Sequence, residues 1–326
     1  MKYKSLFIPT LLLALMLSAC GSAPIAAPTA APTQLPVATA VLQEPDTRTI
    51  TDSAGREVTV PADAARLISL APSTTEILFA LGAGERVIAV DDFSDFPAEV
   101  GNLPRIGGLD YSYNTEQIVA LEPDIVFAAA ITSPEAVQQL TQLGISVVVV
   151  GTFETTFESV FDDIRLMGTV LGRTATADDT VAAMQQRLAA LTDLVATANT
   201  TPRVYWEIDA TDETKPYSIG PGNFIDDILT RAGGVNIFAT SDNPYPQVSA
   251  EQVVAGDPQV IIMSNAAYGT TVESLLARPG WDVISAVREQ RVYPIDDNLV
   301  SRPGPRIVDG LEAAARLIHP ELFALP

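Results

Sequence analysis

EQIVALEPDIVFAA (residues 116–129) and EQVVAGDPQVIIMS (residues 251–264) are two versions of one sequence unit. They align without a gap at an offset of 135 residues, with Glu, Gln, Val, Ala and Pro identical. Each has the form of a short amphipathic helix, a turn that contains Pro, and an apolar strand. A unit used twice predicts two similar α/β lobes, and the cleft at such a domain interface is a common place for a small ligand.

Apolar strands and helical segments alternate around both copies. Short, unbroken apolar runs such as 66–71, 145–150 and 203–208 predict parallel sheets that are covered on both faces. A hairpin is expected over 49–60. The stretch PSTTE (72–76) predicts a helix start, with Ser or Thr as the cap and Glu in the first turn.

A longer helix is expected between the two halves. Over residues 178–197, apolar side chains recur at spacings of three and four, without Gly or Pro: Val181, Met184, Leu188, Leu191 and Val195. This pattern fits a strut between lobes, and it equally fits a core helix of one lobe. If the helix connects the lobes, the predicted fold is an α/β fold of two Rossmann-like lobes joined by a single long helix. The expected bounds are a first lobe at 47–175, a connecting helix at 176–199 and a second lobe at 200–326.

The first residues indicate export. Lys2 and Lys4 precede an apolar run that is too short for a comfortable membrane span, as in a signal peptide over 1–19. The run ends in Leu-Ser-Ala-Cys, and Cys20 is the only cysteine. We therefore expect a lipoprotein anchored outside the cytoplasm through lipidated Cys20, with an ordinary signal peptide as the alternative. Residues 20–46, rich in Ala, Pro and Thr, are expected to form a disordered linker.

The composition argues against several classes of function. A formal net charge of −21 makes nucleic acid an improbable partner, since phosphate binding needs clustered Lys and Arg. The single histidine, His319, is expected at the surface, at a helix end, so neither a metal site nor a histidine-based nucleophile is supported. Paired acids are numerous enough to be solvated or helix-start charges: Asp91-Asp92, Asp162-Asp163, Asp226-Asp227 and Asp296-Asp297.

Aromatic residues are scarce, yet several fall in loops rich in Gly or Pro near the ends of predicted strands, where open α/β sheets bind ligands. They are Phe93, Phe96, Tyr111, Tyr113, Tyr217 and Tyr245. Each one alone could pack on its own lobe. As a set, their flat faces favour a large, partly apolar, planar ligand.

These features together resemble the substrate-binding lipoproteins of ABC importers for vitamin B12, ferric siderophores and haem. The resemblance covers roughly residues 48–320 and is greatest to the cobalamin-binding members. It rests on RLISLAPSTTEILFALGAGERVIAV (66–90), DDFSDFPAEV (91–100), NTEQIVALEPDIVFAA (114–129), QQLTQLGISVVVV (138–150), GGVNIF (233–238), PYPQVSAEQVVAGDPQVII (244–262) and GPRIVDGLEAA (304–314). The family fold has two α/β lobes on one long helix, the helical-backbone or class III architecture.

The resemblance also implies roles for individual residues. Glu116 and Glu251 match the two surface acids that dock on arginines of the permease dimer. Residues that match ligand-contacting positions of the cleft are Phe93, Tyr217, Tyr245, Tyr111 or Tyr113, and Arg302. The chain departs from the cobalamin binder in having Tyr in place of Trp at 245 and a different loop at 109–113.

The expected function is capture of a metal-chelate cofactor, cobalamin or a related corrinoid, and its delivery to an ABC permease dimer with its ATPase. The protein is expected to be a monomer without catalytic activity, resident metal or cofactor of its own. The alternatives are a ferric siderophore or haem as the ligand, a ligand-sensing subunit, and an extracellular hydrolase that uses paired Asp residues.

Overall fold

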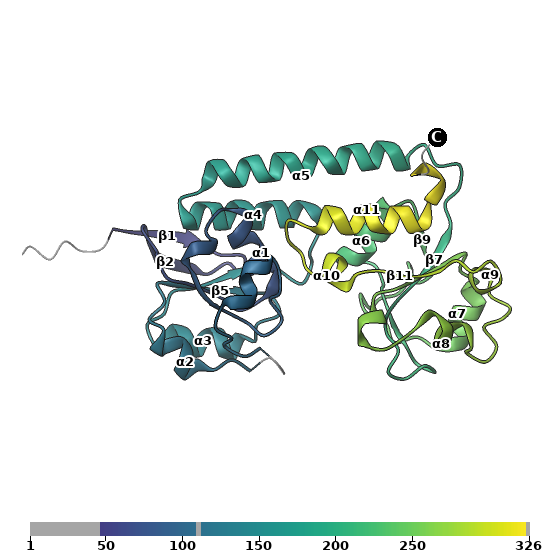
Figure 1. Cartoon of the computed structure of the whole chain (residues 1–326), viewed down its shortest axis with the longest axis horizontal. Helices are drawn as coiled ribbons and strands as arrows, with labels where there is room; N and C mark the ends of the chain where they lie inside the picture. The colour runs from purple at the N-terminus through teal and green to yellow at the C-terminus, as the bar shows by residue number, and fades with distance from the viewer. Residues whose placement is uncertain (1–45, 109–111, 324–326) are drawn as a thin grey trace, which may run out of the picture. The chain divides into compact units, whose positions relative to one another are not determined.

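The computed structural model describes residues 46–108 and 112–323 (Figure 1). The described residues form a single compact unit. The predicted signal peptide, the lipidation site Cys20, most of the linker, and Tyr111 lie outside the described residues.

The first sheet is parallel throughout, with strand order β4-β3-β5-β6. Its strands are β3 (Leu67–Ser69), β4 (Val87–Val90), β5 (Ile125–Ala129) and β6 (Val147–Val150). Buried side chains of α1 (Pro72–Ala80) and α4 (Phe157–Leu171) cover one face, and those of α2 (Thr115–Ala120) and α3 (Pro134–Gln142) cover the other. A hairpin of β1 (Thr47–Thr51) and β2 (Glu57–Pro61) contacts the edge strand, with Ser53 N donating to Val149 O at 3.0 Å.

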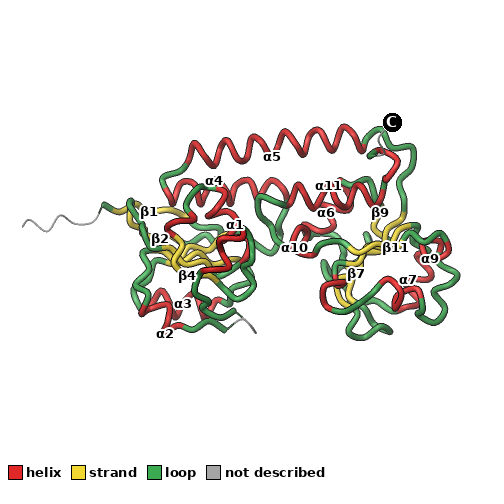
Figure 2. The backbone as a smooth tube through the Cα atoms, in the orientation of Figure 1, coloured by secondary structure: helices red, strands yellow, loops and turns green. Residues whose placement is uncertain are grey.

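The second sheet has strand order β11-β10-β7-β8, with β9 beside β7, and β8 alone runs antiparallel. Its strands are β7 (Arg203–Asp209), β8 (Tyr217–Ser218), β9 (Val235–Asn236), β10 (Val260–Met263) and β11 (Val292–Pro294). One face packs on α6 (Phe224–Arg231) and α11 (Ile307–Ile318), and the other on α7 (Ala250–Gly256), α8 (Val272–Leu276) and α9 (Ser285–Arg288). Figure 2 shows the strands of each sheet between helices.

The sequence repeat is also a repeat of backbone geometry. In the first copy α2 leads to the central strand β5, and in the second α7 leads to the central strand β10. The turn residues Glu122 and Asp257 lie 135 positions apart, and both have a left-handed φ, 45° and 39°. Such a φ is uncommon outside glycine, so its recurrence supports a duplicated unit. An arginine braces each turn: Arg66 donates to the carbonyl of Glu122, and Arg203 to that of Asp257.

The long helix α5 (Thr174–Val195) lies between the two sheets in the sequence, and its predicted apolar stripe is buried except for Val195, which is partly buried. It packs against α4 and against α11, and in Figure 1 it runs alongside both. Its buried residues belong to a continuous apolar cluster that includes Val148 of the first sheet and Val260 of the second. A shared core of this kind resists relative movement of the two halves, because opening them would expose apolar surface.

Three local expectations were wrong. Helix α1 begins without a side-chain cap, because Thr74 and Thr75 donate instead to Ala71 O and join a buried hydroxyl network with Ser69. His319 is fully buried rather than at the surface, with Nδ1 3.1 Å from Glu321 and Nε2 3.3 Å from Gly233 O. Asp91 and Asp163 are buried rather than solvated, with 2% and 7% of their surface exposed.

The described residues also form smaller elements: η1 (Gly84–Arg86), η2 (Ala98–Asn102), η3 (Asn265–Tyr268), α10 (Asp297–Val300) and η4 (Pro320–Leu322). Within residues 46–108 and 112–323, none of the helices combines the length and the apolar character that crossing a bilayer requires.

Candidate ligand-binding cleft

A cavity of about 450 Å³ is lined by residues of both halves of the fold. This volume falls within the usual range for small-molecule sites. From the first half come the start of α1, the loop after β4 and the loops after β5 and β6. From the second half come the loop that carries Tyr245, the end of η3, and the segment 297–303. The strands β4, β5, β6 and β10 end toward this region, as expected for a ligand site at carboxyl ends of parallel strands.

Three of the predicted ligand residues line this cavity: Phe93, Tyr245 and Arg302. Phe93 is 53% exposed and Tyr245 37% exposed, so both rings remain accessible. Tyr113 and Tyr217 are not among the lining residues. The Tyr113 hydroxyl donates to Leu70 O at 3.0 Å and its ring packs against the first sheet's core, while Tyr217 pairs with Gln247 beside β7. The ligand role of each of these residues stays a prediction.

The loop of Phe93 is fixed from beneath by Asp91. The Asp91 carboxylate accepts a hydrogen bond from Phe93 N at 2.9 Å and a short one from the Ser94 hydroxyl. Burial raises the pKa of Asp91, and the two hydrogen bonds partly offset that rise. The buried carboxylate therefore acts as a rigid anchor that aims the Phe93 ring outward.

Tyr245 is held by the backbone around it. Its N–H donates to Asn243 Oδ1 at 2.9 Å, an Asx turn. The preceding carbonyl, Pro244 O, accepts from Asn223 Nδ2 at 2.6 Å, which ties the loop to the cap of α6. Burial raises the pKa of the Tyr245 hydroxyl, so it is a neutral hydrogen-bonding group at neutral pH.

Arg302 joins the two halves at the edge of the cavity. Its Nη1 lies 2.5 Å from Asp95 Oδ1 and 3.4 Å from Glu76 Oε1, and its Nη2 donates to Phe93 O at 3.2 Å. The hydrogen bond from Arg302 lowers the pKa of Asp95. The guanidinium charge is thus already paired with carboxylates, which leaves little of it for an anionic ligand.

Two exposed aromatic residues of the cavity were not among the predicted ligand residues: Phe153 at 73% and Tyr268 at 77% exposure. Phe153 follows β6, and Tyr268 follows β10 with its hydroxyl 3.1 Å from Asp297 Oδ2. Burial and then the Asp297 charge raise the pKa of Tyr268. Their position just beyond an apolar strand is the same signal that drew attention to Phe93, so it could have found them.

The charged residues of the cavity lining are Asp163, Asp297 and Arg302. Because Arg302 is engaged by two further acids, the cavity wall carries an excess of negative charge. Across the described parts of the chain, no cluster of His, Cys, Asp and Glu has the arrangement of a metal site.

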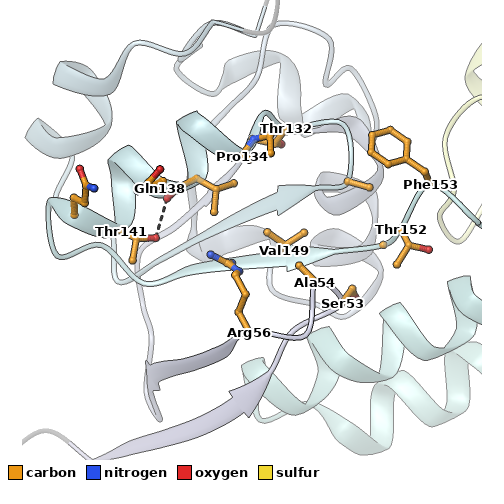
Figure 3. Close-up of a pocket in the computed structure, with 14 residues that line it drawn as sticks. Ser53, Ala54, Arg56, Thr132, Pro134, Gln138, Thr141, Val149, Thr152 and Phe153 are labelled. Atoms are coloured by element: carbon orange, nitrogen blue, oxygen red, sulfur yellow. Dashed lines mark hydrogen bonds between the residues drawn. The ribbon is translucent and has the colours of Figure 1, made fainter.

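A second hollow, of about 560 Å³, lies on the first half between the turn of the β1–β2 hairpin, α3 and the end of β6 (Figure 3). It shares Ala130, Gly151, Thr152 and Phe153 with the cleft. The loop 151–153 therefore forms a wall with a hollow on either side.

The two predicted docking acids occupy matching places. Glu116 is exposed in the first turn of α2, and Glu251 is exposed in the first turn of α7. Both helices are capped, by the side chains of Asn114 and Ser249. The backbone N–H of Glu251, and then the Ser249 hydroxyl, lower the pKa of Glu251 and keep it ionised. Their role in docking stays a prediction.

Comparison with known proteins defines the class of protein to which this fold and cleft belong. The family model described as periplasmic binding protein matches residues 67–299. An ABC transporter substrate-binding lipoprotein of Bacillus subtilis, YvrC, whose function is uncharacterized, is 29% identical over 325 residues, 99% of each chain.

Two solved structures are also similar. The vitamin B12-binding protein BtuF of Vibrio cholerae superposes with a TM-score of 0.68 and 30% identity, covering 81% of this chain and all of that one. The heme-binding protein RhuT of Roseiflexus sp. RS-1 gives a TM-score of 0.72 and 26% identity, covering 79% and 99%.

The chain belongs to the periplasmic binding protein family and has its class III fold. It is thus an extracytoplasmic substrate-binding protein of an ABC importer, and it is not an enzyme. The expectations of fold, family and absence of catalysis are confirmed.

Proposed function

We propose that this protein captures cobalamin or a related corrinoid in the cleft and delivers it to the permease dimer of an ABC importer. The proposal rests on the lining of the cavity, which combines aromatic rings from both halves with an excess of negative charge. Flat rings such as Phe93 and Tyr245 suit the faces of a macrocycle.

The charge of the cavity separates the candidate ligands. A corrinoid carries neutral amide groups around its ring, whereas haem carries two propionates and many ferric siderophores are anionic. An anion would meet Asp163 and Asp297, and it would find the one cationic side chain of the described lining, Arg302, already paired. Haem or a ferric siderophore is the alternative, since one similar structure is that of a heme-binding protein.

Delivery rests on the matched acids. Glu116 and Glu251 give each half one exposed carboxylate on an equivalent helix, which suits two like subunits that each offer a cationic partner. Lipidation of Cys20 would keep the monomer at the membrane surface beside that permease, tethered by the segment up to residue 46.

Calorimetric titration of the purified protein with cyanocobalamin, haemin and the anionic siderophore complex ferric enterobactin tests the proposal. We expect submicromolar affinity for cyanocobalamin and much weaker binding of haemin and ferric enterobactin. Tight binding of haemin or ferric enterobactin without binding of cyanocobalamin would replace the corrinoid by that chelate. Binding of none of the three would remove the chelate-transport proposal altogether.

A further inference from the structure

Asp163 of α4 is a buried acid that the proposed transport function uses only for its charge. It has 7% of its surface exposed and it lines the cleft cavity. One carboxylate oxygen, Oδ1, accepts a hydrogen bond from the Ser53 hydroxyl at 2.8 Å and another from Gly151 N at 3.0 Å. These bonds tie the carboxylate to the hairpin turn, labelled at Ser53 in Figure 3, and to the wall between the two hollows.

The other oxygen, Oδ2, makes no hydrogen bond within residues 46–108 and 112–323. It lies beside Gly151, since a Cβ on that glycine would come within 3.5 Å of Oδ2. The fully enclosed side-chain polar atoms that lack a partner in this part of the chain do not include Oδ2, so Oδ2 keeps some accessible surface. The carboxylate therefore turns one satisfied oxygen to the protein and one unsatisfied oxygen to the cavity.

An ionised carboxylate in this position carries a desolvation penalty until a hydrogen-bond donor pairs with it. Burial raises the pKa of Asp163, which means that the protein around the carboxylate solvates its charge poorly. A donor that reaches Oδ2 on binding removes part of this penalty. Because Ser53 and Gly151 already fix the carboxylate plane, little conformational freedom is lost when the donor arrives.

We propose that Asp163 is a specificity-determining residue of the cleft: its Oδ2 accepts a hydrogen bond from a ligand N–H or O–H and repels a ligand carboxylate. This rests on the proposed function, because a corrinoid offers peripheral amide N–H donors and haem offers propionates. Asp163 thus selects a chelate by the hydrogen-bonding groups on the rim of the ligand, in addition to the fit of the ligand's flat face.

The test replaces Asp163 by Asn. In D163N the amide oxygen still accepts from Ser53 and Gly151, while an NH2 group replaces the free acceptor. Cyanocobalamin affinity should fall by about ten-fold, the usual scale for losing a hydrogen bond to a charged group. Haemin affinity should stay the same or rise. The matched control is Asp162→Asn, which removes the same charge from the neighbouring exposed side chain and should leave both affinities unchanged.

The outcomes separate the possibilities. Unchanged cyanocobalamin binding in D163N would overturn the role of Asp163 while the proposed function stands. Equal losses for cyanocobalamin and haemin, together with a lower unfolding temperature, would show a purely structural carboxylate and overturn it too. If the unaltered protein failed to bind cyanocobalamin, the proposed function itself would fall, and this inference with it.

Discussion

The carboxylate of Glu76 accepts two hydrogen bonds from the guanidinium of Arg306, at 2.8 Å from Nε and 2.6 Å from Nη2. Glu76 comes from α1 over the first sheet, and Arg306 is the residue directly before α11 over the second. Arg302 approaches the same carboxylate, and Arg306 also stacks on Phe96 with its Cζ 4.0 Å from the ring centroid. The pair links the two halves beside the cleft, and Glu76 itself is 3% exposed.

Replacing Glu76 by Ala should destabilise the protein strongly. Two arginines would lose a shared buried partner, and breaking a buried ion pair from one side costs about 3 kcal/mol or more. Urea denaturation of the purified protein measures the free energy of unfolding. The control is Glu312→Ala, whose pairs with Arg187 and Arg316 are exposed and should contribute less than about 1 kcal/mol. Equal effects of the two substitutions would refute the view that Glu76 ties the halves together.

The accessible rings of the cavity should carry a measurable part of ligand affinity. Phe93→Ala and Tyr245→Ala should each weaken cyanocobalamin binding by about ten-fold, since truncation of a central aromatic contact commonly costs 1–2 kcal/mol. Tyr217→Ala serves as the comparison, because this residue was also predicted at the ligand but does not line the cavity. Calorimetry on the three variants shows whether the ligand contacts the residues that line the cavity or the residue that only the sequence resemblance places at the ligand. A loss confined to Tyr217→Ala would favour the resemblance.

The two matched acids should affect uptake and not ligand affinity. Reversing both, as in Glu116→Arg with Glu251→Arg, places positive charge where the permease is proposed to offer arginines, so uptake of labelled cyanocobalamin by cells should fall at least about ten-fold. Affinity measured by calorimetry should not change, because neither acid lines the cleft.

The control for charge reversal uses Glu135→Arg with Glu273→Arg. These residues also lie exposed in capped first helical turns, of α3 and α8, so the helix-dipole cost is matched. Normal uptake by this control, with defective uptake by the first pair, assigns the effect to position. Similar defects in both pairs would point to general charge or stability effects instead.

The fold was predictable because its signals are local. Unbroken apolar strands, the Pro turn repeated at 123 and 258, and the three- and four-residue spacing in α5 each report a short-range preference that packing then obeys. No element was predicted for residues 157–171, where the structure has α4. That helix has a Thr156 cap and a buried apolar face, so its pattern was present in the sequence.

The cleft was only partly predictable, because its details depend on distant partners. Nothing near Glu76 in the sequence indicates that Arg306 is its partner, and the composition of PSTTE instead suggested an ordinary cap. Likewise Asp163 reads as one of many paired acids until packing buries it beside Ser53, 110 residues earlier. Aromatic residues after strands were easier to find, since sheet geometry alone places them at the ligand edge.

The buried carboxylate of Asp163 should give stability a specific dependence on pH. Burial raises the pKa of Asp163 above its ordinary 3.8, so the native state holds a proton that the unfolded chain has already released. Between the pKa of Asp163 in the unfolded chain and its higher pKa in the native state, the contribution of this group to the free energy of unfolding falls as pH rises. This contribution levels off once the native state is also ionised.

D163N lacks this titration, so its stability relative to the unaltered protein should improve from about pH 4 upward and then reach a plateau once Asp163 of the native protein is ionised. Urea denaturation at several pH values gives the difference directly, and other buried acids such as Asp91 cancel because both proteins retain them. Asp193→Asn, an exposed change on α5, should show no such trend. A constant difference between D163N and the unaltered protein across this range would mean that the charged form of Asp163 is as well solvated in the fold as in water.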